Sequence, residues 1–194
     1  EAVSANDSSA TGLALYGTSD YEALLDLTDA VSGKSGKLYI GGRKEEDGIV
    51  TRAEQGEDNA AYGIRLKGNY ASINSGDILV RNVIAVNKAY GVALQDMIAQ
   101  GHEAPAGGAT PIQAENLVID GVKSTGTNPA STMVVGLYNV ADRPTSDENK
   151  NVVIKGRTSI RDITSSEGMF TNNTYAIYNE NSKITLSVGE IEGN

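Results

Sequence analysis

Two short apolar patterns alternate along this chain, and they constrain its fold more than any other feature. The first has an aromatic or aliphatic residue, a small residue, an aliphatic residue, any residue and then Leu or Asn, at 62–66 (YGIRL), 90–94 (YGVAL), 135–139 (VGLYN) and 175–179 (YAIYN). An apolar triplet and a polar residue follow each copy, at 78–81 (ILVR), 117–120 (LVID), 152–155 (VVIK) and, with Thr in the middle of the triplet, 184–187 (ITLS). Repeats indicate stacked units that shield one another from water. Because short apolar segments bounded by Gly, Asn, Asp and Ser are typical of strands, the repeats predict an all-β stack, a β-solenoid.

Alternation assigns the side chains of the first pattern, because successive residues of a strand point to opposite faces. Tyr62, Ile64 and Leu66 share one parity, and Arg65 takes the other, so we expect the first three to point inward. The residues at the Ile64 position should form one interior column: Ile64, Val92, Leu137 and Ile177. The tyrosines at the Tyr62 position should form an internal aromatic ladder: Tyr62, Tyr90 and Tyr175.

In the second pattern the polar residue marks the outer face. These residues are Arg81, Asp120, Lys155 and Ser187. The first and third residues of each apolar triplet should then line the interior, as equivalent positions of one stack. The middle residues of three triplets, Leu79, Val118 and Val153, are expected to point outward. Either an inserted loop covers them, which is the interpretation we favour, or they form an apolar strip for a partner.

The patterns divide the chain unevenly. Residues 1–55 are less regular and are predicted to form N-terminal rungs or a partial cap. Residues 56–194 hold the parallel repeats, interpreted as a fragment of a longer solenoid. The inserts at 96–115 and 141–150 are rich in Gly, Pro and polar residues and are expected to be exposed loops. Residues 19–30 fit two predictions, a short helix after a capping box or a strand, and the sequence does not separate them.

Charge and composition exclude several classes of partner and chemistry. The formal net charge is −9, and no cluster of Lys and Arg is present in the sequence, so neither nucleic acid nor an anionic membrane surface is an expected partner. The chain has no cysteine, which excludes disulfides and Cys-ligated metal. No apolar run approaches the length of a membrane span, so this fragment is not expected to insert into a membrane.

Segments 61–64 (AYGI), 89–92 (AYGV) and 174–186 (TYAIYNENSKITL) resemble the passenger regions of type V secreted autotransporters. The resemblance covers about residues 60–194 well and 1–55 loosely, at the level of the repeat. It implies a right-handed parallel β-helix of the pectin-lyase-like class with loop insertions. It also implies export across the outer membrane to the bacterial cell surface, and an adhesin that acts in host attachment, cell aggregation, biofilm formation or virulence.

No catalytic constellation emerges from the residues. Adjacent acidic pairs occur at 45–46, 57–58 and 147–148, but all lie in polar, turn-like surroundings and are interpreted as solvated charges. The single histidine, His102, follows a glycine in the long Gly/Pro-rich insert and has no second His or Cys to share a metal. We therefore predict no catalytic residue, no metal site and no cofactor.

The resulting functional prediction is a non-catalytic cell-surface adhesin fragment. Its expected partner is a surface protein or glycan of a host or of a neighbouring bacterium, with self-association as a further interaction. The predicted contacts lie in the corner loops and on the outward parity of the strands: His102, Glu103, Tyr138, Asp142, Arg143, Asp147 and Tyr178. Two alternatives stay open, a polysaccharide-binding or polysaccharide-degrading β-helix and a passive stalk.

Overall fold

The computed structural model describes residues 3–5, 9–18, 21–29, 31–52, 60–68, 70–95, 110–128, 130–141, 150–166 and 173–191. These residues form two β-sheets and one short 3₁₀ turn, η1 (Glu45–Asp47). The larger sheet contains β1 (Val3–Ala5), β3 (Ala23–Asp26), β4 (Lys37–Ile40), β5 (Ile49–Thr51), β7 (Ala71–Ala85), β9 (Ile112–Ser124), β11 (Lys150–Thr164) and β13 (Lys183–Ile191). The smaller sheet contains β2 (Ala10–Tyr16), β6 (Ala60–Lys67), β8 (Lys88–Gln95), β10 (Met133–Val140) and β12 (Thr174–Glu180).

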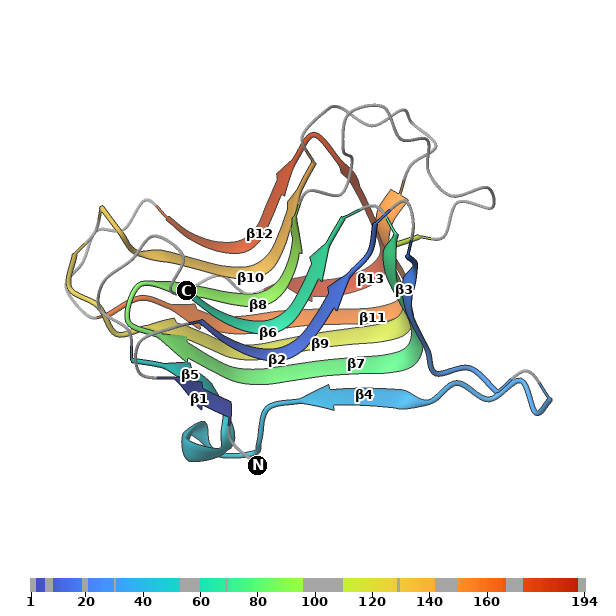
Figure 1. Cartoon of the computed structure of the whole chain (residues 1–194), viewed down its shortest axis with the longest axis horizontal. Helices are drawn as coiled ribbons and strands as arrows, with labels where there is room; N and C mark the ends of the chain where they lie inside the picture. Colours follow the sequence, from blue (N-terminus) through green and yellow to red (C-terminus); the bar gives the residue numbers. More distant parts are fainter. Residues whose placement is uncertain are drawn as a thin grey trace.

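Successive repeats of the chain pair with one another in parallel. From β6 onward the chain alternates between the sheets, so that β7 pairs with β9, β9 with β11 and β11 with β13, while β6, β8, β10 and β12 pair in the same order. Figure 1 shows the two nested series of strands facing each other. The fold is therefore all-β with parallel sheets.

The predicted interior column is confirmed. Ile64 pairs with Val92, Val92 with Leu137, and Leu137 with Ile177. The first three of these residues are 0% exposed and belong to one aliphatic core, to which both sheets contribute side chains. Ile177, on the outermost strand of the smaller sheet, packs against that core but is only half-buried. Stacking of like aliphatic side chains is thus what holds the two sheets together.

The tyrosine prediction was wrong about the face. Tyr62 and Tyr90 are buried, but in a separate cluster on the side of the smaller sheet away from the aliphatic core. The alternation breaks at Gly63, where an added Cβ would meet side-chain carbons of Val80 and Val83 in the core. Because Gly63 and Ile64 both turn toward the core, Tyr62 lies on the same face as Arg65. A local parity count assumes a regular strand, and this strand bends at its glycine.

The four triplets of the second pattern do not occupy equivalent positions in the larger sheet. Ile78 pairs with Leu117, as expected, but Leu117 then pairs with Thr158. The triplet that begins at Val152 instead aligns with the strand segment that begins at Ile112. Each long strand therefore carries two inward-facing segments, and an apolar triplet in the sequence does not reveal which one it occupies. The predicted outer positions hold, since Arg81 and Asp120 are half-buried and Lys155 and Ser187 are exposed.

The middle residues of the triplets do not form one strip. Leu79 and Val118 pair with each other and are half-buried, and Tyr39 of β4 lies beside Leu79. Val153 pairs with Gln113 and Thr185, in the other column. The apolar strip is therefore confined to Tyr39, Leu79 and Val118.

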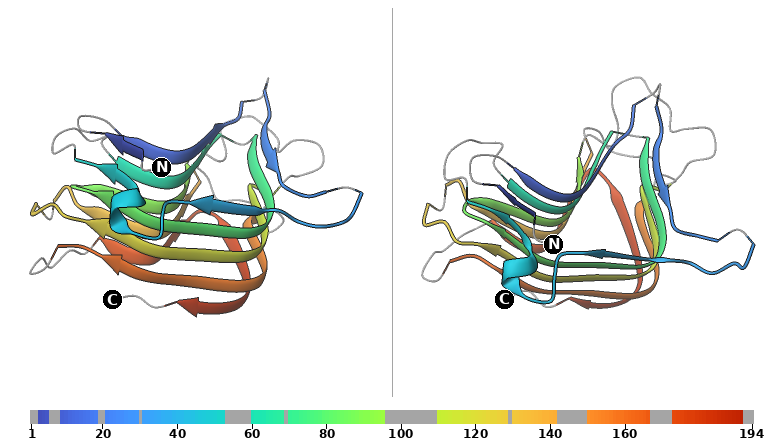
Figure 2. Two further views of the ribbon diagram at one scale, coloured as in Figure 1. Left: turned by 90° about the horizontal axis from the view of Figure 1, so that it is seen from below. Right: turned by 60° about the horizontal axis from the view of Figure 1, so that its bottom comes forward.

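The N-terminal strands join the same sheets as the repeats. Strand β2 pairs with β6, and β3, β4 and β5 pair with three successive segments of β7. Figure 2 shows β4 running beside the long strands of the larger sheet. Residues 23–26, for which the sequence allowed a helix or a strand, form strand β3.

Candidate ligand-binding face

The outer surface of the larger sheet carries alternating charged and apolar columns. In β7 the residues Asp77, Leu79 and Arg81 are half-buried, whereas the intervening Ile78 and Val80 are buried in the core. Parallel pairing continues each outward position onto the next strand, so that Leu79 stands beside Val118 and Arg81 beside Asp120. The alternation that builds the core therefore also places these groups on the outside.

Asp120 is the centre of a three-strand charge network. Its Oδ2 accepts a hydrogen bond of 2.9 Å from Nη2 of Arg161 on β11. Nε of Arg81 on β7 lies 3.4 Å from the same oxygen, an ion-pair distance without hydrogen-bond geometry. The hydrogen bond from Arg161 is the largest cause that holds the pKa of Asp120 below its usual value. The charge of Arg161, a hydrogen bond with Asp162 and the charge of Arg81 act in the same direction, and burial opposes them. One carboxylate thus stands between two guanidinium groups.

The chain bends at equivalent places just after this network. Asn82 and Asp162 have φ of 53° and 54°, and Gly121 has φ of 78°, the left-handed region that Gly, Asn and Asp tolerate best. The side-chain amide of Asn82 donates to the carbonyl oxygens of Gly42 and Lys44, at 2.9 and 3.0 Å. These two bonds hold the segment that carries Arg43 against the edge of the larger sheet.

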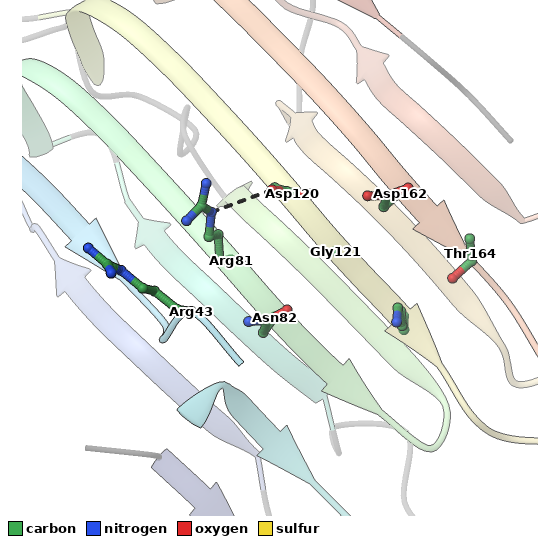
Figure 3. Close-up of a pocket in the computed structure, with 8 residues that line it drawn as sticks. Arg43, Arg81, Asn82, Asp120, Gly121, Asp162 and Thr164 are labelled. Carbon is green, nitrogen blue, oxygen red and sulfur yellow. Dashed lines mark ion pairs between the residues drawn. The ribbon is translucent and has the colours of Figure 1, made fainter. Parts of the chain in front are cut away.

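Two shallow depressions lie over this network and share Arg81. The first, of about 640 Å³, is drawn in Figure 3 and is lined by Arg43, Arg81, Asn82, Asp120, Gly121, Lys123, Asp162 and Thr164. The close-up shows Arg43, Arg81 and Asp120 in succession across the strands. The depression therefore crosses several strands instead of following one.

The second depression, of about 470 Å³, has an apolar floor with polar margins. Tyr39, Leu79 and Val118 are its apolar lining, together with Ile78. Polar groups stand beside them: Asp77, Arg81, Asn116, Arg157, Ser159 and Arg161. Asp77 is already paired, because its Oδ2 lies 3.0 Å from Nζ of Lys37 and its Oδ1 accepts a 2.7 Å bond from Asn116. Those bonds, with Asn116 contributing most, lower the pKa of Asp77.

We call the surface formed by both depressions the arginine face. Among its described lining residues the basic ones are Arg43, Arg81, Lys123, Arg157 and Arg161, and the acidic ones are Asp77, Asp120 and Asp162. The face is thus cationic, although the whole chain has a formal net charge of −9. Such local accumulation attracts anions more strongly than the net charge indicates.

Of the seven residues predicted to bind a ligand, the structure describes only Tyr138 and Tyr178. His102, Glu103, Asp142, Arg143 and Asp147 are outside the described residues, as are the acidic pairs at 57–58 and 147–148. The remaining acidic pair, at 45–46, falls in the turn η1. Contact roles for those five residues stay predictions.

Tyr138 and Tyr178 are brought together on the smaller sheet. Their rings stack with centroids 5.4 Å apart, and Tyr138 makes an edge contact of 5.2 Å with Tyr90. The hydroxyl of Tyr178 donates to Glu180 at 2.9 Å, which raises the pKa of that tyrosine. Both tyrosines are half-buried and pack against the Tyr62–Tyr90 cluster, so they extend that cluster.

Sequence reasoning missed the arginine face for an identifiable reason. The second pattern indicates Arg81 and Asp120 as outward groups but not Arg161, because the three residues before Arg161 (TSI, 158–160) are not an apolar triplet. A count of residues from the bend position would have found Arg161, since Asn82, Gly121 and Asp162 each follow the charged residue directly.

The described residues contain no group of three or more His, Cys, Asp or Glu able to hold a metal ion. Within the same described residues, no helix is both long enough and apolar enough to span a membrane. Comparisons with family models, with curated proteins and with solved structures found no match to this chain.

Proposed function

We propose that this chain is a non-catalytic binding module of an extracellular bacterial adhesin, built as a right-handed parallel β-helix, and that it binds through the arginine face. The observation that carries the site is the charge network of Arg81, Asp120 and Arg161 beside the apolar floor of Leu79 and Val118. A surface of this kind offers both charge and apolar contact area to a partner.

Parallel pairing between successive repeats supports the β-helix. A chain that leaves one strand and returns to a parallel neighbour in the same sheet does so with a right-handed connection in roughly 98% of known cases. The long strands β7, β9 and β11 return in this manner, with one strand of the smaller sheet between each pair.

The charges around Asp120 disfavour it as the catalytic acid of a glycosidase. Asp120 and Asp162 line the same depression, which is the observation that favours a polysaccharide-degrading enzyme as second candidate. Glycoside hydrolysis, however, needs a carboxylic acid with a raised pKa to protonate the leaving oxygen. The arginines lower the pKa of Asp120, which keeps it ionised and unsuited to that role.

The shape of the face fits adhesion by many weak contacts. A ligand that crosses the strands meets Arg81, Asp120 and Arg161 in succession, one from each of three paired strands. Such contacts are individually weak and gain strength when many copies of the protein act together on a cell surface. The expected partner is a surface protein or glycan of a host or neighbouring cell.

The test measures attachment of beads coated with the chain to bacterial and epithelial cells. The double variant Arg81→Gln/Arg161→Gln should lose attachment, and Tyr39→Ala, at a side chain that is 58% exposed, should weaken it without affecting folding. The matched control is Lys34→Gln/Lys155→Gln, which removes the same charge at two exposed positions outside both depressions.

Three results would contradict the proposal. Equal losses in the double variant and the control would show that only net charge matters. Unchanged attachment in the double variant would place the binding site elsewhere. No attachment by the wild-type chain to any cell would indicate a passive stalk.

A further inference from the structure

We propose that Tyr138 and Tyr178, on the side of the smaller sheet away from the aliphatic core, are an oxidative cross-linking site. A one-electron oxidant couples the two phenol rings there into dityrosine. The new bond joins β12, the outermost strand of the smaller sheet in the described part of the chain, to β10. This modification of the chain does not involve the arginine face, so the proposed function does not depend on it.

The composition of the chain directs one-electron oxidation to tyrosine. Cys and Trp are the side chains that compete best with tyrosine for the loss of an electron, and the chain has neither. It has three Met and nine Tyr. Methionine is oxidised to its sulfoxide by gaining an oxygen atom, which an oxidant that only removes electrons does not supply.

Ring contacts join tyrosines across four paired strands. Tyr62 on β6 stacks on Tyr90 on β8, with ring centroids 5.1 Å apart and planes 12° apart. Tyr90 makes an edge contact of 5.2 Å with Tyr138, which stacks on Tyr178 at 5.4 Å and 13°. Rings at these separations are in direct contact. An electron lost from one ring can therefore be replaced from the next, and the vacancy settles where the oxidised ring is most stable.

The Tyr178 end of this array is the one that can release a proton. An oxidised phenol is a strong acid and becomes a stable neutral radical only when its hydroxyl proton leaves. The hydroxyl of Tyr178 donates to a carboxylate oxygen of Glu180 at 2.9 Å, so a base already stands at the proton. The stacked neighbour Tyr138 pairs with Tyr178 in the parallel ladder, which keeps the two rings together.

The other end of the array disfavours the vacancy. The guanidinium group of Arg65 lies 4.5 Å from the ring centroid of Tyr62, and its positive charge opposes a second positive charge on that ring. The hydroxyl of Tyr90 points to Sδ of Met133 at 3.4 Å, and a thioether sulfur is a weak acceptor that does not take the proton. Oxidation therefore accumulates at Tyr138 and Tyr178.

The coupling balances as two one-electron steps. Each phenol gives one electron to one molecule of oxidant, which is reduced, and loses its hydroxyl proton, to Glu180 in the case of Tyr178. The two radicals then form one C–C bond between ring carbons ortho to the oxygens. The hydrogens on those two carbons move to the phenol oxygens, so both hydroxyls are restored.

The test exposes the 194-residue chain to photo-excited ruthenium tris(bipyridine), with persulfate to regenerate this one-electron oxidant. Mass spectrometry of a digest should find the peptides of Tyr138 and Tyr178 joined, each less one hydrogen, in a yield that dilution does not change. Tyr178→Phe keeps the ring and should abolish the joined peptides. Tyr21→Phe, at a ring that is 77% exposed and outside the array, is the matched control and should leave their yield unchanged. Glu180→Gln keeps an acceptor but removes the base, and should slow the coupling severalfold.

Three results would overturn the inference. Coupling confined to tyrosines of different molecules, such as Tyr21 and Tyr39, would fall on dilution and would show that exposure alone decides the site. A link from Tyr178 to Tyr175, whose rings also touch at 5.2 Å, would show that the stacked pair is not the one that couples. An equal rate in Glu180→Gln would remove the reason for oxidation to collect at Tyr178. None of these results bears on cell attachment through the arginine face.

Discussion

Arg161 donates a 2.9 Å hydrogen bond to Asp120, although 41 residues separate the two in the chain. The two side chains meet because β9 and β11 pair in parallel with Asp120 directly beside Arg161. With Arg81 on the opposite side, this contact joins three strands on the outer surface, and it leaves one more positive than negative charge there.

Acid should expose the contribution of Asp120 to stability. Its pKa is lowered in the folded chain, so the unfolded chain takes up the proton first as the pH falls. The stabilisation is therefore complete above the unfolded value, about 4, and is lost as the pH falls through the lower folded value. Asp120→Asn should cost about 1 kcal/mol at pH 7 and should flatten the decline in stability between pH 5 and pH 2.5. Urea unfolding followed by circular dichroism measures both.

The control for this prediction is Glu46→Gln. Glu46 also pairs with a cation, Lys44, but both side chains are more than two-thirds exposed, at 72% and 71%. Exposed pairs contribute little, so no measurable change is expected at pH 7. An equal loss in the two variants would show that the position of the carboxylate between two strands has no special effect.

Truncating side chains of the interior column to Ala should lower the free energy of unfolding by different amounts at different strands. Leu137 is 0% exposed and Ile177, its paired neighbour, is half-buried. Leu137→Ala should lower the free energy of unfolding by about 3 kcal/mol. Ile177→Ala should lower it by about half of that, because folding buries less of the apolar surface of Ile177. Chemical unfolding of both variants tests the order. A larger loss for Ile177→Ala would contradict the stacking order of the column.

Gly91, which stands beside the core as Gly63 does, should not tolerate an added methyl group. An added Cβ at Gly91 would lie 2.6 Å from the carbonyl oxygen of Gly136 and 2.6 Å from Cγ2 of Ile119. Gly91→Ala should therefore destabilise the chain by about 1 to 3 kcal/mol through overpacking. Gly33→Asn is the control, because Gly33 has open space around it and a φ of 66° that Asn adopts readily. Thermal unfolding should separate the two variants, and equal melting temperatures would contradict the close approach.

Alkaline pH should destabilise the aromatic cluster through Tyr90. Burial, reinforced by the neighbouring Tyr62, raises the pKa of Tyr90 above its ordinary value of 10. The unfolded chain therefore releases the phenolic proton first, and stability falls as the pH rises above 10. Tyr90→Phe removes the phenolic proton and should therefore make this fall in stability shallower. The same variant loses one contact, the 3.4 Å hydrogen bond from the Tyr90 hydroxyl to Sδ of Met133. Urea unfolding at pH 8 and pH 10.5 measures the difference, and an unchanged slope would show that Tyr90 does not contribute to it.

The strand segments and the interior column were predictable from local pattern. Ile64, Val92, Leu137 and Ile177 occupy one row as expected, because an aliphatic residue that repeats in equivalent surroundings has only the interior in which to bury its side chain. The strands of the first pattern were found for the same reason.

The face of the tyrosines and the register of the second pattern were not predictable. A parity count gives the correct side only while the strand stays regular, and the bend at Gly63 depends on the close approach of Val80 from the other sheet. Likewise the triplets at 117–119 and 152–154 read alike, and only pairing shows that they occupy different columns.

Local pattern is sufficient to predict stacked strands with an aliphatic interior, since the spacing of apolar residues that are close together in the chain indicates which side chains are buried. Which charged groups share the outer surface follows instead from the pairing of distant strands. Arg81, Asp120 and Arg161 come from three separate repeats, and their contact depends on the register between strands, which a shift of one residue would abolish.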